Sequence, residues 1–495
     1  MNINFSNAKD GSQTFSIDNI FFHSTYSPLK EAERFVQNFT LPYNPKVLII
    51  IEPGFSYVYK YFKEKYPKAK IGIIRLIDQT LSDSDTWDFI LNINSSKNIS
   101  NQLMTNFSEE ELLSSSILSW KPAENLFHEK INQIYSEYKE ILNQSKTILT
   151  TRQFFEKNWL INSCNFFKYT KKIATFNNRI NVPVVICASG PSLKSNIELI
   201  RKYKNNIFII ALSSAFSVLI SKNICPDLIL TTDGGFWAGE HLKKARINKE
   251  IPIACPAESY IPKKILNQNP IICLNYNDIK KSFSTLLTEF LCKNYYYCER
   301  NGTVSGTALR FSQSLTTKNI YFCGLDLSAQ KGFQHTQPNE LEKNNCIYDN
   351  RIKNSLLRNM SSRFNSSSLK IYENWFVNCS NVSNIFRVIN ENEKNNSLGN
   401  IKDISTFDFE NDLLNTKETK SKNYFKITEN SFDSQKIYSF VIEKLQNEEI
   451  KHQLFPADYL SIENSQDEEN TNFCKERLSV KINKLLIQIR KIFDV

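Results

Sequence analysis

A short apolar run, expected to form a strand over 184–188, ends abruptly at the motif SGPS, residues 189–192. The chain has only 12 glycines among 495 residues, and eight of them lie between residues 190 and 332. We expect Gly190 to make a tight turn with positive φ, and a helix to begin at Leu193. Free N–H groups at a helix start attract anions, and serine hydroxyls can add hydrogen bonds. The residues expected to bind an anion here are Ser189, Gly190, Pro191 and Ser192.

Similar polar turns follow the strands expected over 207–212, 228–232 and 320–323, and a glycine-containing turn over 301–308 opens another helix. The carboxyl ends of parallel strands share one edge of a sheet, so we expect these turns to build one ligand site. The further candidates are Ser213, Asp233, Gly234, Thr303, Ser305, Gly306 and Asp326, together with His335, one of only five histidines.

The elements that must position these residues alternate between strand and helix from residue 180 to 390, with further strands expected over 252–255 and 271–274. This alternation predicts an α/β fold with a central open, mostly parallel, Rossmann-like sheet that carries helices on both faces. Apolar runs over 47–51 and 70–78 predict a smaller N-terminal α/β domain. The end of the chain has a helical pattern.

This pattern predicts five regions. They are an N-terminal α/β domain over 1–125, a helical connector over 126–178, a catalytic domain over 179–390, a linker or loops over 391–430, and a C-terminal helical region over 431–495.

Composition excludes several classes of protein. The net charge of +10 is spread along the chain without a basic stripe or a known module, so we expect no nucleic-acid partner. The eleven cysteines lack any C-x-x-C pair, which favours a reducing compartment. The N-terminus lacks an apolar signal core, and the longest apolar run, 208–220, is too short to span a bilayer. We therefore expect a cytoplasmic protein without a membrane span.

Three motifs resemble those of the motility-associated factor (Maf) glycosyltransferases of bacteria, which modify flagellin with nonulosonic acids such as pseudaminic or legionaminic acid. They are CASGPSL at 187–193, NGTVSGTALRFSQSLTTKNIYFCGLDL at 301–327, and HSTYSPLKEA at 23–32. The core also resembles the small bacterial sialyltransferases, whose donor is a CMP-sugar. The resemblance implies a sialyltransferase-like fold, a CMP-nonulosonic acid as donor, and Ser or Thr of flagellin or another protein as acceptor.

The same resemblance implies roles for single residues. Gly190 and Ser192 would lie near the donor, Ser305 and Gly306 would contact its nucleotide, and His335 would be the general base. A CMP-sugar already carries its leaving phosphate, so we expect no metal and no cofactor. Asp233, which ends a strand, is expected to orient hydroxyls of the donor or the acceptor. The tyrosines that follow the G-x-D-F turn of the sialyltransferases are absent from residues 328–333 here.

Two other functions stay open at this point. Archaeal 6-hydroxymethylpterin diphosphokinases resemble the same core, and the segment PDLILTTDGG at 226–235 could supply a carboxylate that holds Mg²⁺ beside phosphates. The missing tyrosines are compatible with a non-catalytic flagellar or surface-assembly factor on the same fold.

Overall fold

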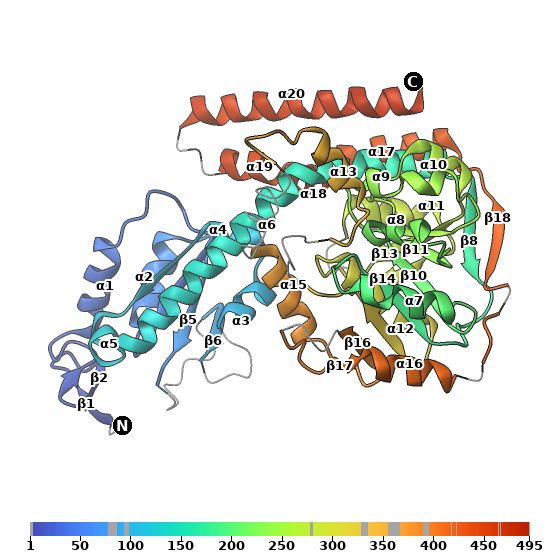
Figure 1. The fold of residues 1–495 in the computed structure, drawn as a ribbon. Helices are drawn as coiled ribbons and strands as arrows, with labels where there is room; N and C mark the ends of the chain where they lie inside the picture. Colours follow the sequence, from blue (N-terminus) through green and yellow to red (C-terminus); the bar gives the residue numbers. More distant parts are fainter. Residues whose placement is uncertain are drawn as a thin grey trace. The chain divides into compact units, whose positions relative to one another are not determined.

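The computed structural model describes residues 3–77, 87–93, 99–277, 281–327, 335–354, 367–389, 396–416, 418–421, 423–463, 465 and 467–494. The chain divides into two compact units (Figure 1). The first comprises Met1–Phe154 and Leu454–Ile482, and the second comprises Phe155–Gln453 and Asn483–Val495. The expected five-part division of the chain stays a prediction.

The first unit contains a small parallel sheet with strand order β6-β5-β4-β7 and a separate antiparallel sheet of β1, β2 and β3. The strands are β1 (Ile3–Asn7), β2 (Gln13–Ile17), β3 (Ile20–Phe21), β4 (Val47–Ile51), β5 (Lys70–Arg75), β6 (Phe89–Asn92) and β7 (Ser115–Ser119). Helices α1 (Pro28–Asn38), α2 (Tyr57–Lys65), α3 (Ile99–Asn106), α4 (Glu109–Leu113), α5 (Lys121–Leu126) and α19 (Pro456–Glu463) complete it. All five residues of β4 are buried, as its unbroken apolar run predicts.

His23 of the HSTYSPLKEA motif has a structural role in this unit. Its Nε2 accepts a hydrogen bond from the N–H of Phe55 at 2.9 Å, and its side chain is fully buried. Gly54 has a φ of +64°, and a Cβ at this position would lie 2.6 Å from the Nε2 of His23. Burial, followed by the positive charge of Arg75, lowers the pKa of His23 to about 3, so the ring is neutral at neutral pH.

The second unit is built on an eleven-stranded sheet with order β17-β16-β15-β9-β10-β11-β12-β13-β8-β18, and β14 pairs with β13. Every strand pair is parallel except β18 with β8. The strands are β8 (Lys172–Phe176), β9 (Val184–Cys187), β10 (Phe208–Leu212), β11 (Leu228–Leu230), β12 (Ile253–Pro256), β13 (Ile271–Tyr276), β14 (Tyr296–Cys298), β15 (Ile320–Cys323), β16 (Ile385–Ile389), β17 (Lys402–Ser405) and β18 (Phe425–Glu429). The predicted α/β class with its large, mostly parallel sheet is confirmed.

The helices of the second unit follow the strands. They are α7 (Leu193–Lys202), α8 (Ser213–Ser221), α9 (Ala238–His241), the short helix η1 (Lys243–Arg246), α10 (Lys263–Gln268), α11 (Phe283–Leu291), α12 (Val304–Leu315), α13 (Glu340–Ile347), α15 (Ser367–Val377), α16 (Thr406–Leu414) and α17 (Ser434–Gln446). Three helices contribute residues to both units: α6 (His128–Tyr169), α18 (Glu448–Leu454) and α20 (Glu468–Phe493). The C-terminal region is thus helical, as predicted.

Helices α8 and α12 cover opposite faces of the large sheet. Alternate residues of a strand point to opposite faces. From strands β8 to β15, the core that contains Leu309 and Phe311 of α12 takes only even-numbered residues, such as Ile186 and Ile210. No residue of α8 belongs to that core, although α8 contacts β10 and β11. Helix α8 therefore lies on the other face.

The order of the strands reverses at β9. From β9 the chain proceeds to β10 on one side, and β15 later pairs with β9 on its other side. In open α/β sheets, ligands bind beyond the carboxyl ends of the strands at such a switch point. The turn after β9, which contains the SGPS motif, and the turn after β15 meet there.

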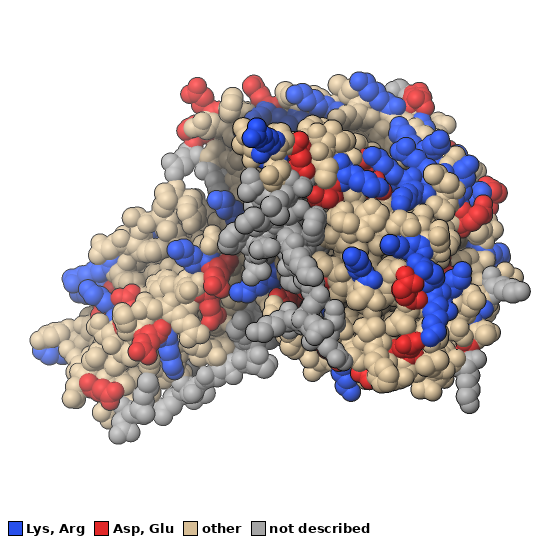
Figure 2. Space-filling view, in the orientation of Figure 1, with Lys and Arg blue, Asp and Glu red and all other residues tan. Residues whose placement is uncertain are grey.

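The face drawn in Figure 2 shows lysines and arginines scattered over the second unit with acidic residues among them. No helix of the described residues combines the length and the apolar character that crossing a membrane requires.

Candidate active site

Ser189 and His335 form a pair at the switch point. The Oγ of Ser189 lies 2.9 Å from the Nδ1 of His335, and the hydroxyl of Ser214 donates to the same Oγ at 2.9 Å. The N–H of Thr336 donates to the carbonyl oxygen of Ser189 at 2.7 Å, which holds the histidine segment against the turn after β9. The structure thus brings together two residues that the sequence singled out and that are 146 positions apart.

Burial lowers the pKa of His335, and the nearby carboxylate of Glu342 opposes this effect only in part. The imidazole is therefore neutral at neutral pH and can accept a proton from a substrate. A second histidine lies close by. Burial and the charge of His335 lower the pKa of His241, the last residue of α9, to about 4. Sequence reasoning missed His241, because a single histidine on a one-turn helix has no distinguishing spacing.

The helix start after the SGPS motif is closed to a ligand. The N–H of Ser192 donates to the Oδ2 of Asp326 at 2.8 Å, and the Ser192 hydroxyl donates to the other carboxylate oxygen. The N–H groups of Leu193, Lys194 and Ser195 donate to carbonyl oxygens of the preceding turn. The N–H groups that we expected to be free for an anion are therefore engaged within the protein, and the Asp326 carboxylate lies where the anion would bind.

Gly190 does not have the positive φ that we expected, so this part of the prediction is wrong. A glycine is needed because two turns meet here. A Cβ on Gly190 would lie 2.4 Å from the carbonyl oxygen of Gly324 and 2.6 Å from the Oδ2 of Asp326. The N–H of Gly190 donates to that carbonyl oxygen at 2.8 Å. The positive φ at this junction belongs to Gly324, at +83°.

The start of α12 is open. The N–H groups of Val304, Ser305 and Gly306 have no hydrogen-bond partner among the described residues. Ser305 is 8% exposed, and its hydroxyl makes no hydrogen bond to the described chain. Thr303, the N-cap residue, makes no side-chain cap hydrogen bond, so its hydroxyl is also available. Three N–H groups, two hydroxyls and the helix dipole together form a site that suits an anion.

Gly306 allows the loop before α12 to pack closely. A Cβ at this position would lie 2.8 to 2.9 Å from three atoms of the Asn301 side-chain amide. The Oδ1 of Asn301 accepts a hydrogen bond from the N–H of Thr303 at 3.1 Å. The glycine therefore supports the geometry of the open helix start.

Asp233 and Gly234 belong to a different part of the sheet edge. Asp233 is exposed, and its Oδ1 accepts a hydrogen bond from the N–H of Gly235 at 2.8 Å. A Cβ on Gly234 would lie 2.4 Å from the Nε1 of Trp159 in α6, so the turn packs tightly against this ring. Burial and the charge of Asp233 raise the pKa of Tyr372. The charge of Asp233 thus acts on Tyr372, and the described residues show no contact between Asp233 and His335.

Arg300 and Glu258 form an ion pair at the same edge, which sequence reasoning missed. The two guanidinium nitrogens of Arg300 lie 2.7 and 3.1 Å from the two carboxylate oxygens of Glu258, which is 2% exposed. The guanidinium lies 4.1 Å from the ring centroid of Tyr276 and 5.4 Å from that of Trp159. Both charged residues follow apolar strands, so the rule that selected Asp233 and Asp326 also applies to them.

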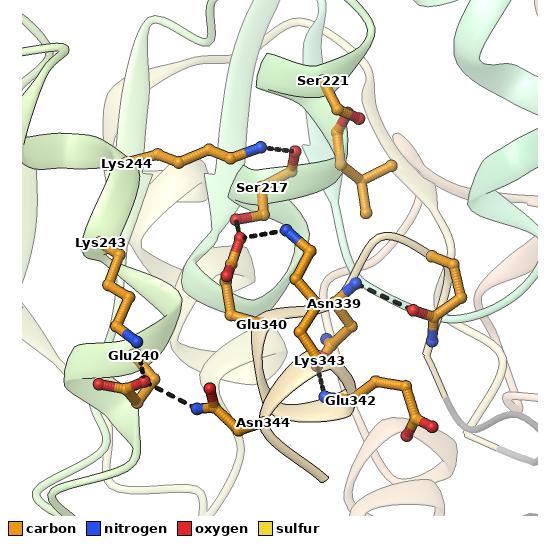
Figure 3. A network of polar contacts seen from close by, with 12 residues as sticks. Ser217, Ser221, Glu240, Lys243, Lys244, Asn339, Glu340, Glu342, Lys343 and Asn344 are labelled. Atoms are coloured by element: carbon orange, nitrogen blue, oxygen red, sulfur yellow. Dashed lines mark hydrogen bonds and ion pairs between the residues drawn. The ribbon is translucent and has the colours of Figure 1, made fainter. Parts of the chain in front are cut away.

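A polar network holds the segment that follows His335 (Figure 3). The Oε1 of Glu340, at the start of α13, accepts hydrogen bonds from the Ser217 hydroxyl at 2.9 Å and from the Nζ of Lys343 at 3.0 Å. The Nδ2 of Asn344 donates to Glu240 of α9 at 2.8 Å. Because these contacts join α13 to α8 and α9, they restrict the position of His335 relative to Ser189.

The described residues contain no group of three or more histidine, cysteine or acidic side chains that could hold a metal ion.

Comparison with known proteins gives matches of three kinds. Residues 157–332 match a family described as 6-hydroxymethylpterin diphosphokinase MptE-like. A protein of Treponema pallidum (strain Nichols), described as an uncharacterized protein, is 27% identical over 320 residues, which are 64% of this chain and 69% of that protein. The structure of a Maf glycosyltransferase from Magnetospirillum magneticum AMB-1 aligns with 99% of this chain and 90% of its own, with a TM-score of 0.47 and 12% identity. The structural likeness concerns the fold alone, and at this level it carries no argument about activity.

Proposed function

We propose that this protein is a glycosyltransferase that moves a nonulosonic, sialic-acid-like sugar from a CMP-activated donor to a Ser or Thr hydroxyl of a protein, with flagellin as the acceptor. The observation that supports this most directly is that the helix with free N–H groups and the neutral histidine both lie at the carboxyl edge of the sheet. Free N–H groups can bind an anionic nucleotide, and a neutral histidine can accept the proton that the acceptor hydroxyl must lose.

The phosphate of the donor would bind at the start of α12. The free N–H groups of Val304, Ser305 and Gly306 would donate to its oxygens, and the hydroxyls of Thr303 and Ser305 would add hydrogen bonds. The charge on the phosphate grows as CMP departs, so fixed donors at this position stabilise the transition state more than the bound substrate. Of the residues predicted to bind the CMP-sugar, Thr303, Ser305 and Gly306 fit this proposal. Ser192 and Asp326 instead form hydrogen bonds with each other.

The transfer step is balanced without another reactant. The bond between the anomeric carbon and the phosphate oxygen breaks, and its electron pair stays on CMP. The acceptor oxygen forms the new bond, and its proton moves to His335. For the Nε2 of His335 to accept this proton, the Nδ1 must carry a hydrogen and donate it to the Oγ of Ser189. The hydroxyl of Ser214 donates to the same oxygen, so the two serines favour this tautomer.

Transfer to flagellin tests the proposal. The purified protein is incubated with a CMP-nonulosonic acid and unmodified flagellin, and the flagellin is analysed by intact mass spectrometry. A mass increase of one sugar residue per modified site supports the function. Deletion of the gene should remove the same modification from flagellin in cells. An unchanged glycan after deletion would contradict the proposal.

A nucleotide-dependent diphosphokinase is the second candidate, and the family match over residues 157–332 favours it. In that case the start of α12 would bind the phosphates of ATP, and Mg²⁺ would be needed to neutralise them. ATP-dependent transfer of diphosphate to 6-hydroxymethylpterin by the purified protein would favour this function over glycosyl transfer.

A further inference from the structure

Helix α20 is apolar on two sides. On one side its side chains are packed against the protein, and the buried residues there are Leu478, Leu485 and Ile489. A helix that packs on one side usually carries polar residues on the other. Figure 1 shows α20 as one continuous helix. Its other side nevertheless carries three large apolar residues that are more than half exposed, namely Phe473 (63%), Val480 (52%) and Ile487 (51%).

These three exposed residues recur every seven positions. Seven residues make almost two turns of an α-helix, so Phe473, Val480 and Ile487 lie on one face and form a stripe about 21 Å long. We call these three residues the outer stripe. An apolar residue that returns every seven positions on an exposed face is typical of a helix that pairs with another helix.

Four charged residues flank the outer stripe, and they are arranged symmetrically about Val480. Glu476 and Lys484 lie four positions before and after Val480, and Glu469 and Lys491 lie eleven positions before and after it. These separations are close to whole helical turns, so all four residues lie on the face of the stripe. All four are exposed, and none forms an ion pair with the described residues. The charge along the stripe therefore changes from negative to positive at its centre.

This arrangement is complementary to itself when a second copy of the helix runs antiparallel. In an antiparallel pair centred on Val480, residues that are equally far before and after this position lie at the same level. Phe473 then packs against Ile487 of the second copy, and Val480 packs against Val480. Glu476 lies level with Lys484 of the second copy, so opposite charges meet. A parallel pair would instead bring like charges together.

We infer that α20 is a dimerisation helix, and that its outer stripe binds the outer stripe of a second copy of this chain in antiparallel orientation. Both copies contribute the same residues, so the interface has two-fold symmetry, and the axis passes beside Val480. The antiparallel orientation also brings the opposite ends of the two helix dipoles together. One helix face buries less than the roughly 1,600 Å² of a stable interface, so we expect a dissociation constant in the micromolar range.

Sedimentation equilibrium of the full chain tests the inference. The wild-type protein should change from monomer to dimer between about 1 and about 200 µM. Val480→Glu should weaken the dimer about 10-fold or more, because two carboxylates would be buried against each other at the axis. Ser479→Glu is the matched control, because it adds the same charge at an exposed position outside the stripe, and it should leave the dimer unchanged. Both positions are exposed, so both variants should keep the melting temperature of the wild type.

An exchange of charges tests the antiparallel orientation. Glu476→Lys alone should weaken the dimer about threefold or more, because two lysines would then lie at the same level. Adding Lys484→Glu to the same chain should restore the dissociation constant to within about twofold of the wild-type value. A parallel pair predicts neither the loss nor the recovery, because like charges would face each other in every variant.

The outcomes separate this inference from the proposed function. Wild-type protein that stays monomeric at about 200 µM overturns the inference. A dimer that Val480→Glu weakens no more than Ser479→Glu does also overturns it, because the copies would then associate through another surface. Failure of the charge exchange to restore the dimer overturns the antiparallel orientation. None of these measurements involves CMP or sugar transfer, so the proposed function can fail or stand independently.

Discussion

At the scale of single residues, the proposed role of His335 as a base depends on burial and on two serines. Replacing His335 with Ala removes the group that we propose as acceptor of the substrate proton, so turnover should fall by about 10² to 10⁴. The affinity for CMP should stay nearly unchanged, because the phosphate is expected to bind at α12. Transfer kinetics and calorimetric titration of the variant measure both quantities. Activity of the variant within a few-fold of wild type would contradict the role of His335 as the general base.

The lowered pKa of His335 also predicts how the proposed transfer reaction should depend on pH. A histidine with its ordinary pKa of about 6.5 would be half protonated at that pH and would lose its function as a base below it. Because burial lowers the pKa of His335, the base stays neutral further into the acid range. The acid limb of the kcat/KM profile should therefore lie below pH 6.5. A limb at or above pH 6.5 would contradict this assignment.

The sequence predicts that Gly190 is needed, but for a positive φ that the residue does not have. Its backbone is needed for contact between two turns, because any Cβ would meet Gly324 and Asp326. Gly190→Ala should therefore destabilise the second unit by about 1–3 kcal/mol, the usual cost of overpacking. Urea unfolding curves of the variant measure this change. Full stability combined with lost CMP binding would instead indicate direct contact with the ligand.

At the scale of elements, the sequence predicts where the strands lie and which polar turns follow them, because buried parallel strands appear as short apolar runs. The state of each helix start is not predictable. Ser192 and Asp326 are 134 residues apart, and only the pairing of β9 with β15 shows that the carboxylate closes α7. Capping propensity is local, so α7, α8 and α12 look alike in the sequence. The same limit explains why His241 was missed, whereas the rule of polar residues after apolar strands also applies to Arg300 and Glu258.

The open start of α12 gives a prediction at this scale. Ser305→Asp should introduce a carboxylate where the phosphate is expected to bind and should weaken CMP binding by about 10-fold or more. An acidic side chain in the first turn interacts favourably with the helix dipole and stabilises the helix, so the melting temperature of the variant should not fall. Ser195→Asp in α7 is the matched control. Unchanged CMP affinity in folded Ser305→Asp protein would show that the nucleotide binds elsewhere.

At the scale of the whole molecule, each unit contains a neutral histidine whose pKa is lowered by burial. The pKa values of His23 and His241 are about 3 and about 4 in the folded protein, below the ordinary value of about 6.5 in an unfolded chain. Between these limits the unfolded chain binds more protons, so the stability present above pH 6.5 is lost as the pH falls. His23 alone should reduce the free energy of unfolding by about 2 kcal/mol at pH 5.

Chemical denaturation at pH 7.5 and pH 5 measures this loss. The first unit contains His23, so its unfolding transition should show the full effect. The effect of His241 should be smaller, because its side chain is partly exposed. His23→Gln should flatten the pH dependence of the first transition, although it also lowers stability at every pH. A first transition with the same free energy at both pH values would contradict the assignment of a buried neutral imidazole.

The central claim is that this protein transfers a sugar acid from CMP to a protein hydroxyl. Hydrogen-bond donors at the start of α12 and the base His335 would act without a metal ion. The most direct measurement is the intact mass of flagellin after incubation with the protein and a CMP-nonulosonic acid, in the presence and absence of excess EDTA. Parallel reactions contain ATP and 6-hydroxymethylpterin. The account predicts a mass increase of one nonulosonic residue per modified site, unaffected by EDTA, and no product from the pterin. Unmodified flagellin together with ATP-dependent diphosphorylation of the pterin would contradict it.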